Sequence, residues 1–155
     1  LTSYYRGVLM SAFALDANND LYPLAYSFAS SENDDDWLWF FQELKHIVGD
    51  RVIVLVSERN SSLLLGIIQT FGGDCNAWCL RHLRENFSKF MSSKGMRNKM
   101  RETGLKMLND IAYARDRRMY DHYLAIMHNF GEEMANWVRE NGPEHWTNAL
   151  FPTKR

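Results

Sequence analysis

The chain has 155 residues, of which 46% are hydrophobic and 14% aromatic. This is enough apolar material for one folded domain with a core, and it excludes a disordered chain. No apolar run approaches the roughly 18 residues of a membrane-spanning helix and no signal peptide is visible, so we expect no membrane partner. Because the chain does not begin with Met, we interpret it as a piece of a longer protein.

The net charge of −1 conceals an uneven distribution of charge along the chain. Residues 79–118 contain eleven Lys or Arg against four Asp or Glu, a balance of +7, which leaves −8 for the remainder. A basic block of this kind predicts a surface that meets a polyanion, whereas a merely solvated helix face is the alternative interpretation.

The first elements predicted are a hairpin and a helix. Two apolar stretches of strand length, Arg6–Asp16 and Leu21–Ser30, flank a cluster of turn-forming residues and therefore predict an antiparallel hairpin. Acidic residues from Glu32 to Asp36 then open a helix that Gly49 ends. Its apolar face is predicted to consist of Trp37, Phe40, Phe41, Leu44, Ile47 and Val48.

The stretch Arg51–Arg59 follows, and its unbroken apolar run over residues 52–56 predicts a strand buried on both faces. Glu58 would then lie at the carboxyl end of a central strand, where ligands bind in open α/β sheets. The alternative is that Glu58 only marks the point where the strand meets water. A second helix after Asn60, with Leu64, Ile67, Ile68 and Phe71 on one face, and a short strand over residues 74–78 complete this part.

From Cys79 onwards the pattern predicts helices only. Apolar residues at helical spacing form four stripes, which we interpret as core: Leu80, Leu83, Phe87 and Phe90; Met100, Met107, Leu108 and Ile111; Met119, Tyr123, Ile126 and Phe130; and Met134, Trp137 and Val138. The element order predicts an α/β protein with one mixed sheet, helices on its faces, and a helical region after it.

Two sets of residues carry candidate chemistry. Cys79 and His82 lie three residues apart at the start of a helix, and with Cys75 they could hold a metal ion. A structural Cys and a hydrogen-bonded His are the alternative, which we favour, so we do not expect zinc. The second set consists of cations predicted to contact DNA phosphates, with no base-reading motif: Arg81, Arg84, Lys89, Lys94, Arg97, Lys99, Arg101 and Lys106.

Several ordered motifs occur along the chain: Tyr5–Met10, Asp16–Asn19, Tyr22–Tyr26, Glu32–Asn33 with Trp37, Trp39, Phe40 and Leu44 after them, Val54–Arg59, Cys79–Leu83 and Asn86–Phe87. Together they resemble a known family, the Mutator-like (MULE) transposase domain of plants. The resemblance is close from residue 4 to about residue 90 and looser in the helical remainder.

The resemblance implies a ribonuclease H-like fold whose first strand lies before Leu1, with a core over residues 1–78 and a helical insertion over 79–155. It also implies cut-and-paste DNA transposition in the nucleus by two aspartates and a glutamate that bind Mg²⁺ or Mn²⁺. Cys79 and His82 match the family's Cys-x-x-His pattern, and Glu58 stands at the position of the second aspartate. Glu132 or Glu133, of which we choose Glu133, is assigned to the third acid from its position alone.

These expectations leave three functions open. The first is a transposase or transposase-derived protein acting on terminal inverted repeats, with catalysis weakened because Glu58 replaces an aspartate. The second is a domesticated protein that binds regulatory DNA sites without catalysis. The third is a structural scaffold that forms homo-oligomers through its Met and aromatic stripes.

Overall fold

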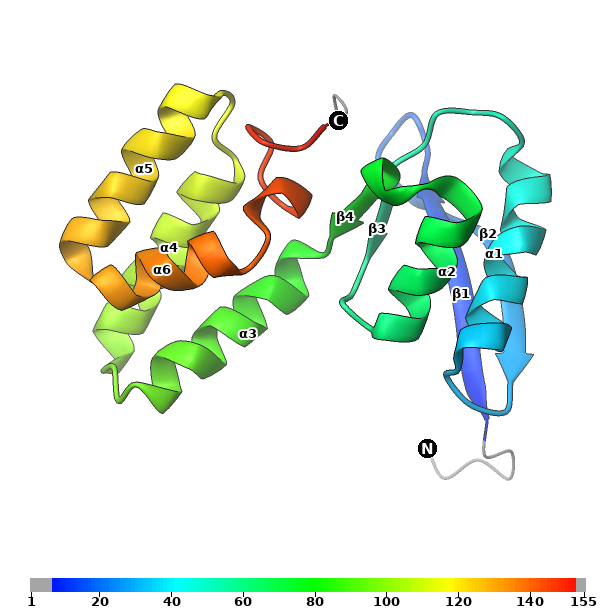
Figure 1. Cartoon of the computed structure of the whole chain (residues 1–155), viewed down its shortest axis with the longest axis horizontal. Helices are drawn as coiled ribbons and strands as arrows, with labels where there is room; N and C mark the ends of the chain where they lie inside the picture. Colours follow the sequence, from blue (N-terminus) through cyan, green and yellow to red (C-terminus); the bar gives the residue numbers. More distant parts are fainter. Residues whose placement is uncertain (1–6, 153–155) are drawn as a thin grey trace. The chain divides into compact units, whose positions relative to one another are not determined.

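The computed structural model describes residues 7–152, which divide into two compact units (Figure 1). The first unit comprises the chain up to residue 55 together with residues 59–76. The second comprises residues 56–58 and the chain from residue 77 onwards. The fold is mixed α/β, with strands early in the chain and a mostly helical C-terminal region, as the sequence predicts.

The first unit begins with the predicted hairpin, formed by β1 (Val8–Leu15) and β2 (Leu21–Ala29). The strands are antiparallel, with Val8 opposite Ala29 and an irregular register after Ala12. Asp16 builds the turn, because its side-chain Oδ1 accepts hydrogen bonds from the backbone N–H groups of Asn18 and Asp20, at 2.8 and 2.9 Å.

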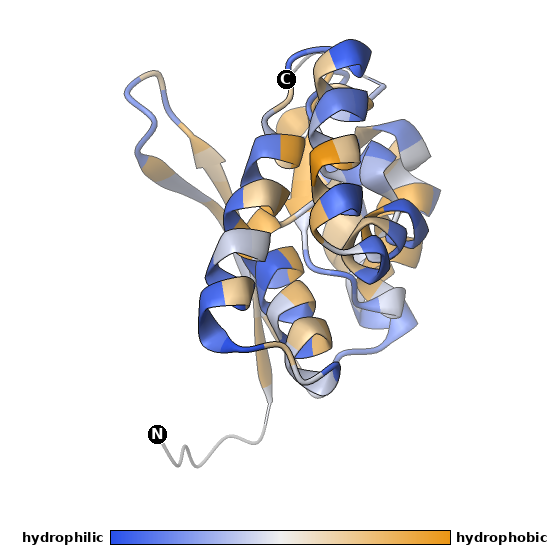
Figure 2. Ribbon diagram, turned by 90° about the vertical axis from the view of Figure 1, so that its left-hand side faces the viewer, coloured by the Kyte–Doolittle hydropathy of each residue, from blue (hydrophilic) through white to orange (hydrophobic). Residues whose placement is uncertain are grey.

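One face of the hairpin is packed and the other is exposed. Met10 and Ala29 enter the core of the first unit, whereas Leu9, Phe13 and Phe28 remain 47–72% exposed. Figure 2 shows apolar residues along both strands and a largely hydrophilic turn at the tip. The expectation of helices on both faces of the sheet is therefore wrong for this hairpin in residues 7–152, because the residues alternate between a covered face and an open one.

The packed face meets α1 (Asp34–Val48) and α2 (Ser61–Phe71), which lie side by side. Each helix begins at an Asn whose side chain accepts a backbone hydrogen bond: Asn33 from Asp36 at 2.9 Å, and Asn60 from Leu63 at 3.1 Å. The side chain of Asn60 also donates to Glu32 at 3.1 Å, which ties the start of α2 to the segment before α1. The two caps explain why both helices start where they do.

The apolar faces of these helices differ in part from the prediction. On α1 the predicted Trp37 and Leu44 are buried, but Ile47 is half-exposed. On α2 the buried stripe contains Leu63, Gly66 and Ile67, while the predicted Ile68 is 52% exposed. The stripe is shifted because α2 approaches α1 through the side of the helix that carries Gly66, which has no side chain to hold the helices apart.

The predicted buried strand over residues 52–56 is wrong in extent and in burial. The strand β3 covers only Leu55–Ser57, and Val52 and Val56 are 88% and 66% exposed. It pairs with β4 (Asn76–Trp78), which follows the short 3-10 helix η1 (Gly73–Cys75). Residues 7–152 thus contain two separate two-stranded sheets instead of one mixed sheet. The physical reason is that a buried strand needs neighbours on both sides, and β3 has one.

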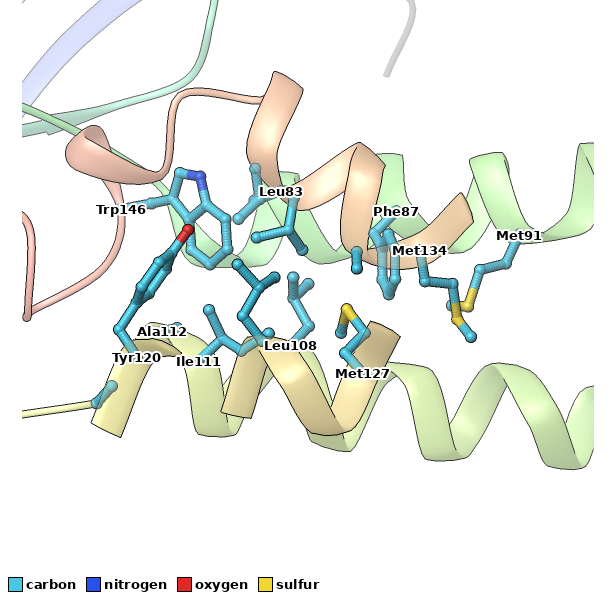
Figure 3. Packing of buried hydrophobic residues seen from close by; sticks show 14 residues of the cluster. Leu83, Phe87, Met91, Leu108, Ile111, Ala112, Tyr120, Met127, Met134 and Trp146 are labelled. Atoms are coloured by element: carbon cyan, nitrogen blue, oxygen red, sulfur yellow. The ribbon is translucent and has the colours of Figure 1, made fainter. Parts of the chain in front are cut away.

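The second unit is held together by a helical core, drawn in Figure 3. Phe87 and Met91 of the first helix, Leu108 and Ile111 of the second, and Met134 of the fourth are fully buried in it. The helices are α3 (Leu80–Ser93), α4 (Asn98–Ala112), α5 (Arg117–Phe130) and α6 (Glu132–Glu140), and the 3-10 helix η2 (Pro143–His145) follows.

The stripe predicted for α5 is wrong by one position. The buried residues are Tyr120, Leu124 and Met127, whereas the predicted Ile126 and Phe130 are 41% and 38% exposed. Both stripes have helical spacing, and packing against α4 and α6 selects the first.

The C-terminal segment adds a core residue that the sequence patterns did not predict. Trp146 is 2% exposed, and its indole N–H donates to the backbone oxygen of Asn141 at 2.8 Å. The backbone N–H of Asn148 donates to the backbone oxygen of Ala112 at 2.9 Å, which fastens this segment to the end of α4.

Candidate functional site

Glu58 is the first residue after β3 and lies two residues before the cap of α2. The segment is fixed on one side by the backbone oxygen of Ser57, which accepts from the N–H of Cys79 at 2.8 Å. On the other side, Asn60 fixes the start of α2. Glu58 is exposed, and among residues 7–152 its carboxylate has no hydrogen bond or ion pair. Its carboxylate is therefore available to a ligand.

A divalent metal site needs several converging ligands, and the described part of the chain does not bring them together. No group of three or more His, Cys, Asp or Glu lies close enough to hold an ion. Glu133, the residue assigned to the third acid, lies in the first turn of α6 and forms an ion pair with Lys94 at 3.1 Å. Residues 7–152 therefore do not supply three or more protein ligands for a metal ion at Glu58.

Cys79 and His82 lie at the junction of β4 and α3. Nη2 of Arg81 is 3.0 Å from Nε2 of His82, and because a guanidinium only donates, this ring nitrogen is the acceptor. In this tautomer the ring proton is on Nδ1, which is buried without a partner in the described residues. This geometry is that of a hydrogen-bonded histidine.

Cys75 lies at the end of η1 and behaves as a protonated thiol. Its Sγ donates to the backbone oxygen of Gly72 at 3.2 Å. Burial raises the pKa of the Cys75 thiol above its ordinary value of 9.0. Metal binding requires the thiolate, so this environment disfavours Cys75 as a ligand.

Four of the eight predicted DNA-contacting cations are held by neighbouring side chains. Arg84 of α3 donates to Asn109 of α4, and Arg101 of α4 donates to Ser88 of α3 at 2.9 Å, so these two arginines cross-link the helices. The other two form exposed ion pairs, Arg81 with Glu85 at 3.6 Å and Lys94 with Glu133 at 3.1 Å.

The other four predicted cations are exposed and unpaired in the described chain: Lys89, Arg97, Lys99 and Lys106. They come from α3, from α4 and from the loop between them. Their charges are not neutralised by a bound carboxylate, so they are the members of the predicted set best suited to phosphate contacts.

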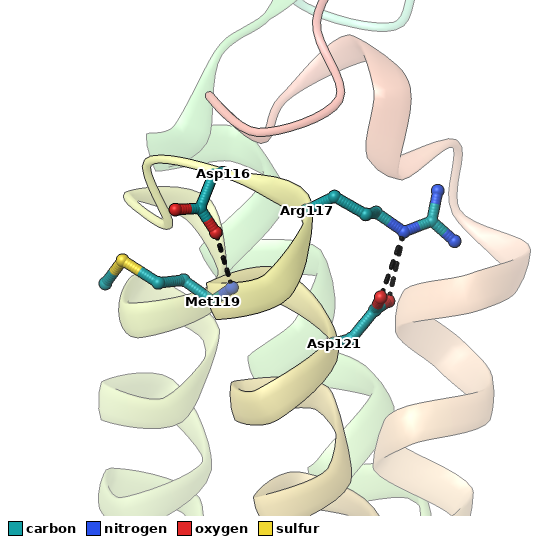
Figure 4. A network of polar contacts seen from close by, with 4 residues as sticks. All are labelled: Asp116, Arg117, Met119 and Asp121. Carbon is teal, nitrogen blue, oxygen red and sulfur yellow. Dashed lines mark hydrogen bonds and ion pairs between the residues drawn. The ribbon is translucent and has the colours of Figure 1, made fainter.

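The structure also brings together cations that the sequence analysis did not select. Arg117 begins α5 and Arg139 lies near the end of α6, and both line a groove between the two helices. Arg117 is paired with Asp121 through its Nε, at 3.1 and 3.2 Å (Figure 4). Arg117 falls within the basic block, but Arg139 falls outside it, and nothing in the local pattern links the two.

A strand-end carboxylate and exposed cations on a helical unit are the groups expected of a protein that handles phosphodiesters. Comparison with known families makes this class specific, because the MULE transposase domain matches residues 1–86. The match covers more than half of the chain, so the chain belongs to this family and is transposase-related. No curated protein matches the chain.

The matched range divides the candidate residues. Glu58, Cys79 and His82 lie inside it, together with the cations Arg81 and Arg84. The helices α4 to α6, with Glu133 and the α5–α6 groove, lie outside it. No helix in residues 7–152 is long and apolar enough to cross a membrane.

Proposed function

We propose that the protein is a transposase-related protein that binds DNA through its helical unit. The observation that carries this proposal is the MULE match over residues 1–86, because transposases act on DNA. The cations Lys89, Arg97, Lys99 and Lys106 support it, since each is exposed and free of a carboxylate partner within the described residues. Terminal inverted repeats or regulatory sites are the DNA targets that we propose.

Salt dependence tests DNA binding directly. Each phosphate contact releases condensed counterions, so the logarithm of the affinity falls with the logarithm of salt concentration by about 0.9 per contact on duplex DNA. We expect the affinity for a labelled duplex, measured by fluorescence anisotropy, to fall steeply between low and moderate salt. An affinity that stays flat over this range refutes the proposed binding.

Metal-dependent cut-and-paste transposition is the second function that we propose. Glu58 lies within the matched range, and we assign it to the second-acid position from the family resemblance. In such a site Mg²⁺ or Mn²⁺ activates the attacking oxygen and stabilises the leaving one. Glu58 would contribute one oxygen ligand, and the first acid belongs before Leu1 in the ribonuclease H-like arrangement that we propose. Glu133 remains the proposed third acid, although it would first have to leave its ion pair with Lys94.

The substitution at position 58 is expected to weaken catalysis. Glutamate has one methylene more than aspartate, which adds about 1.5 Å of reach. A site that holds two ions at a fixed separation tolerates such a displacement poorly. The proposed outcome is a protein that has kept its DNA-binding surface while losing most of its strand cleavage.

The test uses the full-length protein, terminal-inverted-repeat DNA and Mn²⁺. We expect little nicking by the natural protein and more nicking by Glu58→Asp, with Glu58→Gln as the inactive control. Nicking by the natural protein that Glu58→Gln abolishes would show an intact catalytic site and overturn the loss of activity. The absence of nicking in all three proteins would refute the catalytic proposal.

The remaining parts of the proposal concern organisation and place. We propose that residues 1–78 belong to the ribonuclease H-like core and residues 79–155 to its helical insertion, and that the protein acts in a plant nucleus, where a non-catalytic form would regulate transcription. A homo-oligomeric scaffold has less support, because Phe87, Met134 and Val138 of its predicted stripes fill the core of the second unit. A stable dimer found by light scattering would support the homo-oligomeric scaffold after all.

A further inference from the structure

A groove of about 450 Å³ runs between α5 and α6 of the second unit, in the part of the chain that the family match does not reach. Arg117, Asp121, His128 and Asn129 line it from α5, and Arg139 lines it from α6. All five side chains belong to exposed residues, so the groove is open to solvent. Its floor is apolar and is formed by the buried Tyr120 and Leu124.

The two arginines of the groove retain most of their hydrogen-bonding capacity. Arg117 bonds both carboxylate oxygens of Asp121 through Nε alone, and Figure 4 shows its two terminal nitrogens directed away from that carboxylate. Arg139 donates from Nη1 to Asn136 at 2.8 Å and forms no carboxylate ion pair in the described chain. Each guanidinium therefore has N–H groups left for a further acceptor.

The charges of both arginines affect one group, the hydroxyl of Tyr120. Burial raises the pKa of the Tyr120 hydroxyl, while the charges of Arg117 and Arg139 both oppose this rise. Asp121 and Glu144 act in the same direction as burial. Two guanidinium groups from different helices are thus within electrostatic reach of the same oxygen. Among the residues that line the groove, the two arginines stand against one carboxylate, that of Asp121. Glu144 acts on the same hydroxyl but does not line the groove.

We propose that this α5–α6 groove is a phosphate-binding site that holds the backbone of a nucleic-acid strand. The guanidinium fork matches the oxygen geometry of a phosphate, and two forks from opposite walls can clamp one phosphodiester. Tyr120 is 4% exposed, so its ring is not available for base stacking. The inference rests on the proposed DNA-binding function and places part of it on α5 and α6.

The chain offers a matched control at the start of α5 and in the segment just before it. Arg118 and Arg115 are exposed arginines close to Arg117 in sequence, but neither lines the groove. The double variant Arg117→Gln/Arg139→Gln and the double variant Arg115→Gln/Arg118→Gln each remove two positive charges. Arg139→Gln alone breaks no carboxylate ion pair in residues 7–152, which provides a second groove variant that leaves the exposed Arg117–Asp121 pair in place.

The experiment measures the affinity of the full chain and its variants for a labelled duplex over a salt series. We expect the groove double variant to reduce the slope of log affinity against log salt by about 0.9, which corresponds to the loss of one phosphate contact. The control double variant should change it by less than half of that. Asp121→Asn should raise the affinity, because it removes a carboxylate that competes with phosphate for Arg117.

The outcomes separate this inference from the function on which it rests. If the natural protein binds DNA and the groove and control variants behave alike, the groove proposal is overturned while DNA binding stands. If the natural protein does not bind DNA, both fail. Perturbation of the backbone amide signals of Asn129 and Arg139 by inorganic phosphate, measured by NMR and absent in Arg139→Gln, would support the groove as the phosphate site.

Discussion

Gly66 is the point at which α2 touches the backbone of α1, and Gly66→Ala therefore tests the packing of these two helices in the first unit. A Cβ at residue 66 would lie 2.9 Å from Cδ2 of Phe41, 3.2 Å from the carbonyl carbon of Trp37 and 3.3 Å from the backbone nitrogen of Leu38. Two of these three atoms are backbone and cannot rotate away. The third belongs to a ring that is only 5% exposed.

The ring of Phe41 has little freedom to move. It stacks on Trp37 at 5.6 Å and meets Phe40 and Phe71 edge-on, at 5.8 and 6.3 Å. Relief of the close contacts around the added Cβ would therefore require α2 to shift away from α1. Overpacking of this kind costs about 1–3 kcal/mol. Because two of the three contacts are with backbone atoms, we expect a cost at the upper end of this range. The better helix propensity of Ala offsets about 1 kcal/mol of it, so the net loss in the free energy of unfolding should be about 2 kcal/mol.

Gly104→Ala in α4 is the matched control. There the added Cβ would meet Sδ of Met91 at 2.7 Å and Sδ of Met134 at 3.1 Å, which are parts of flexible side chains. The helix-propensity gain is the same, so we expect a smaller loss or none.

Urea denaturation followed by circular dichroism measures the free energies, and hydrogen exchange shows whether the loss falls on α1 and α2. If Gly66→Ala is as stable as the natural protein, or if Gly104→Ala loses more than Gly66→Ala, the reasoning about the α1–α2 contact is wrong.

Three further predictions concern individual side chains. Asn60→Ala should destabilise the first unit by about 0.5–2 kcal/mol, measured by urea denaturation, because α2 loses its cap; an unchanged midpoint would contradict this. Burial raises the pKa of Tyr120 above 10.0, so the unfolded chain loses this proton first and the free energy of unfolding should fall as pH rises above about 10. The free energy of unfolding of Tyr120→Phe should fall less over that pH range. Identical curves for the variant and the natural protein would count against a raised pKa for Tyr120. In a Cys79→Ser background, iodoacetamide should alkylate Cys75 with a half-maximal rate above pH 9.0, whereas a midpoint below that value would contradict the buried thiol.

The sequence predicted the elements that local signals determine. The turn at Asp16 and the caps at Asn33 and Asn60 are formed by hydrogen bonds that span two to four residues, so residue type and spacing are enough to find them. The family resemblance was also accessible, because its motifs lie, except for Phe87, within the range that the MULE comparison matches.

The predictions that were wrong concern features that depend on contacts between distant parts of the chain. The run of residues 52–56 has the composition of a buried strand, but strand length and burial depend on neighbours that the run itself does not encode. Likewise α5 carries two apolar stripes of equal spacing, and only packing selects the one through Leu124.

Contacts between distant residues also hold some of the predicted phosphate-binding cations. Arg84 is held by Asn109, 25 residues later, and Arg101 is held by Ser88, 13 residues earlier. Arg139 joins Arg117 only because α6 folds back beside α5. Counting charges along the sequence cannot separate a cation that links two helices from one that is free to meet a phosphate.

The central claim is that unpaired cations of the helical unit contact DNA phosphates, and a comparison of two charge-matched variants tests it most directly. Lys89→Gln/Lys106→Gln removes two unpaired cations, whereas Arg81→Gln/Lys94→Gln removes two that are bound to glutamates. We predict that the first variant reduces the salt slope of duplex binding by about 1.8 and that the second reduces it by less than half as much. Equal slopes for both variants and the natural protein would contradict the account.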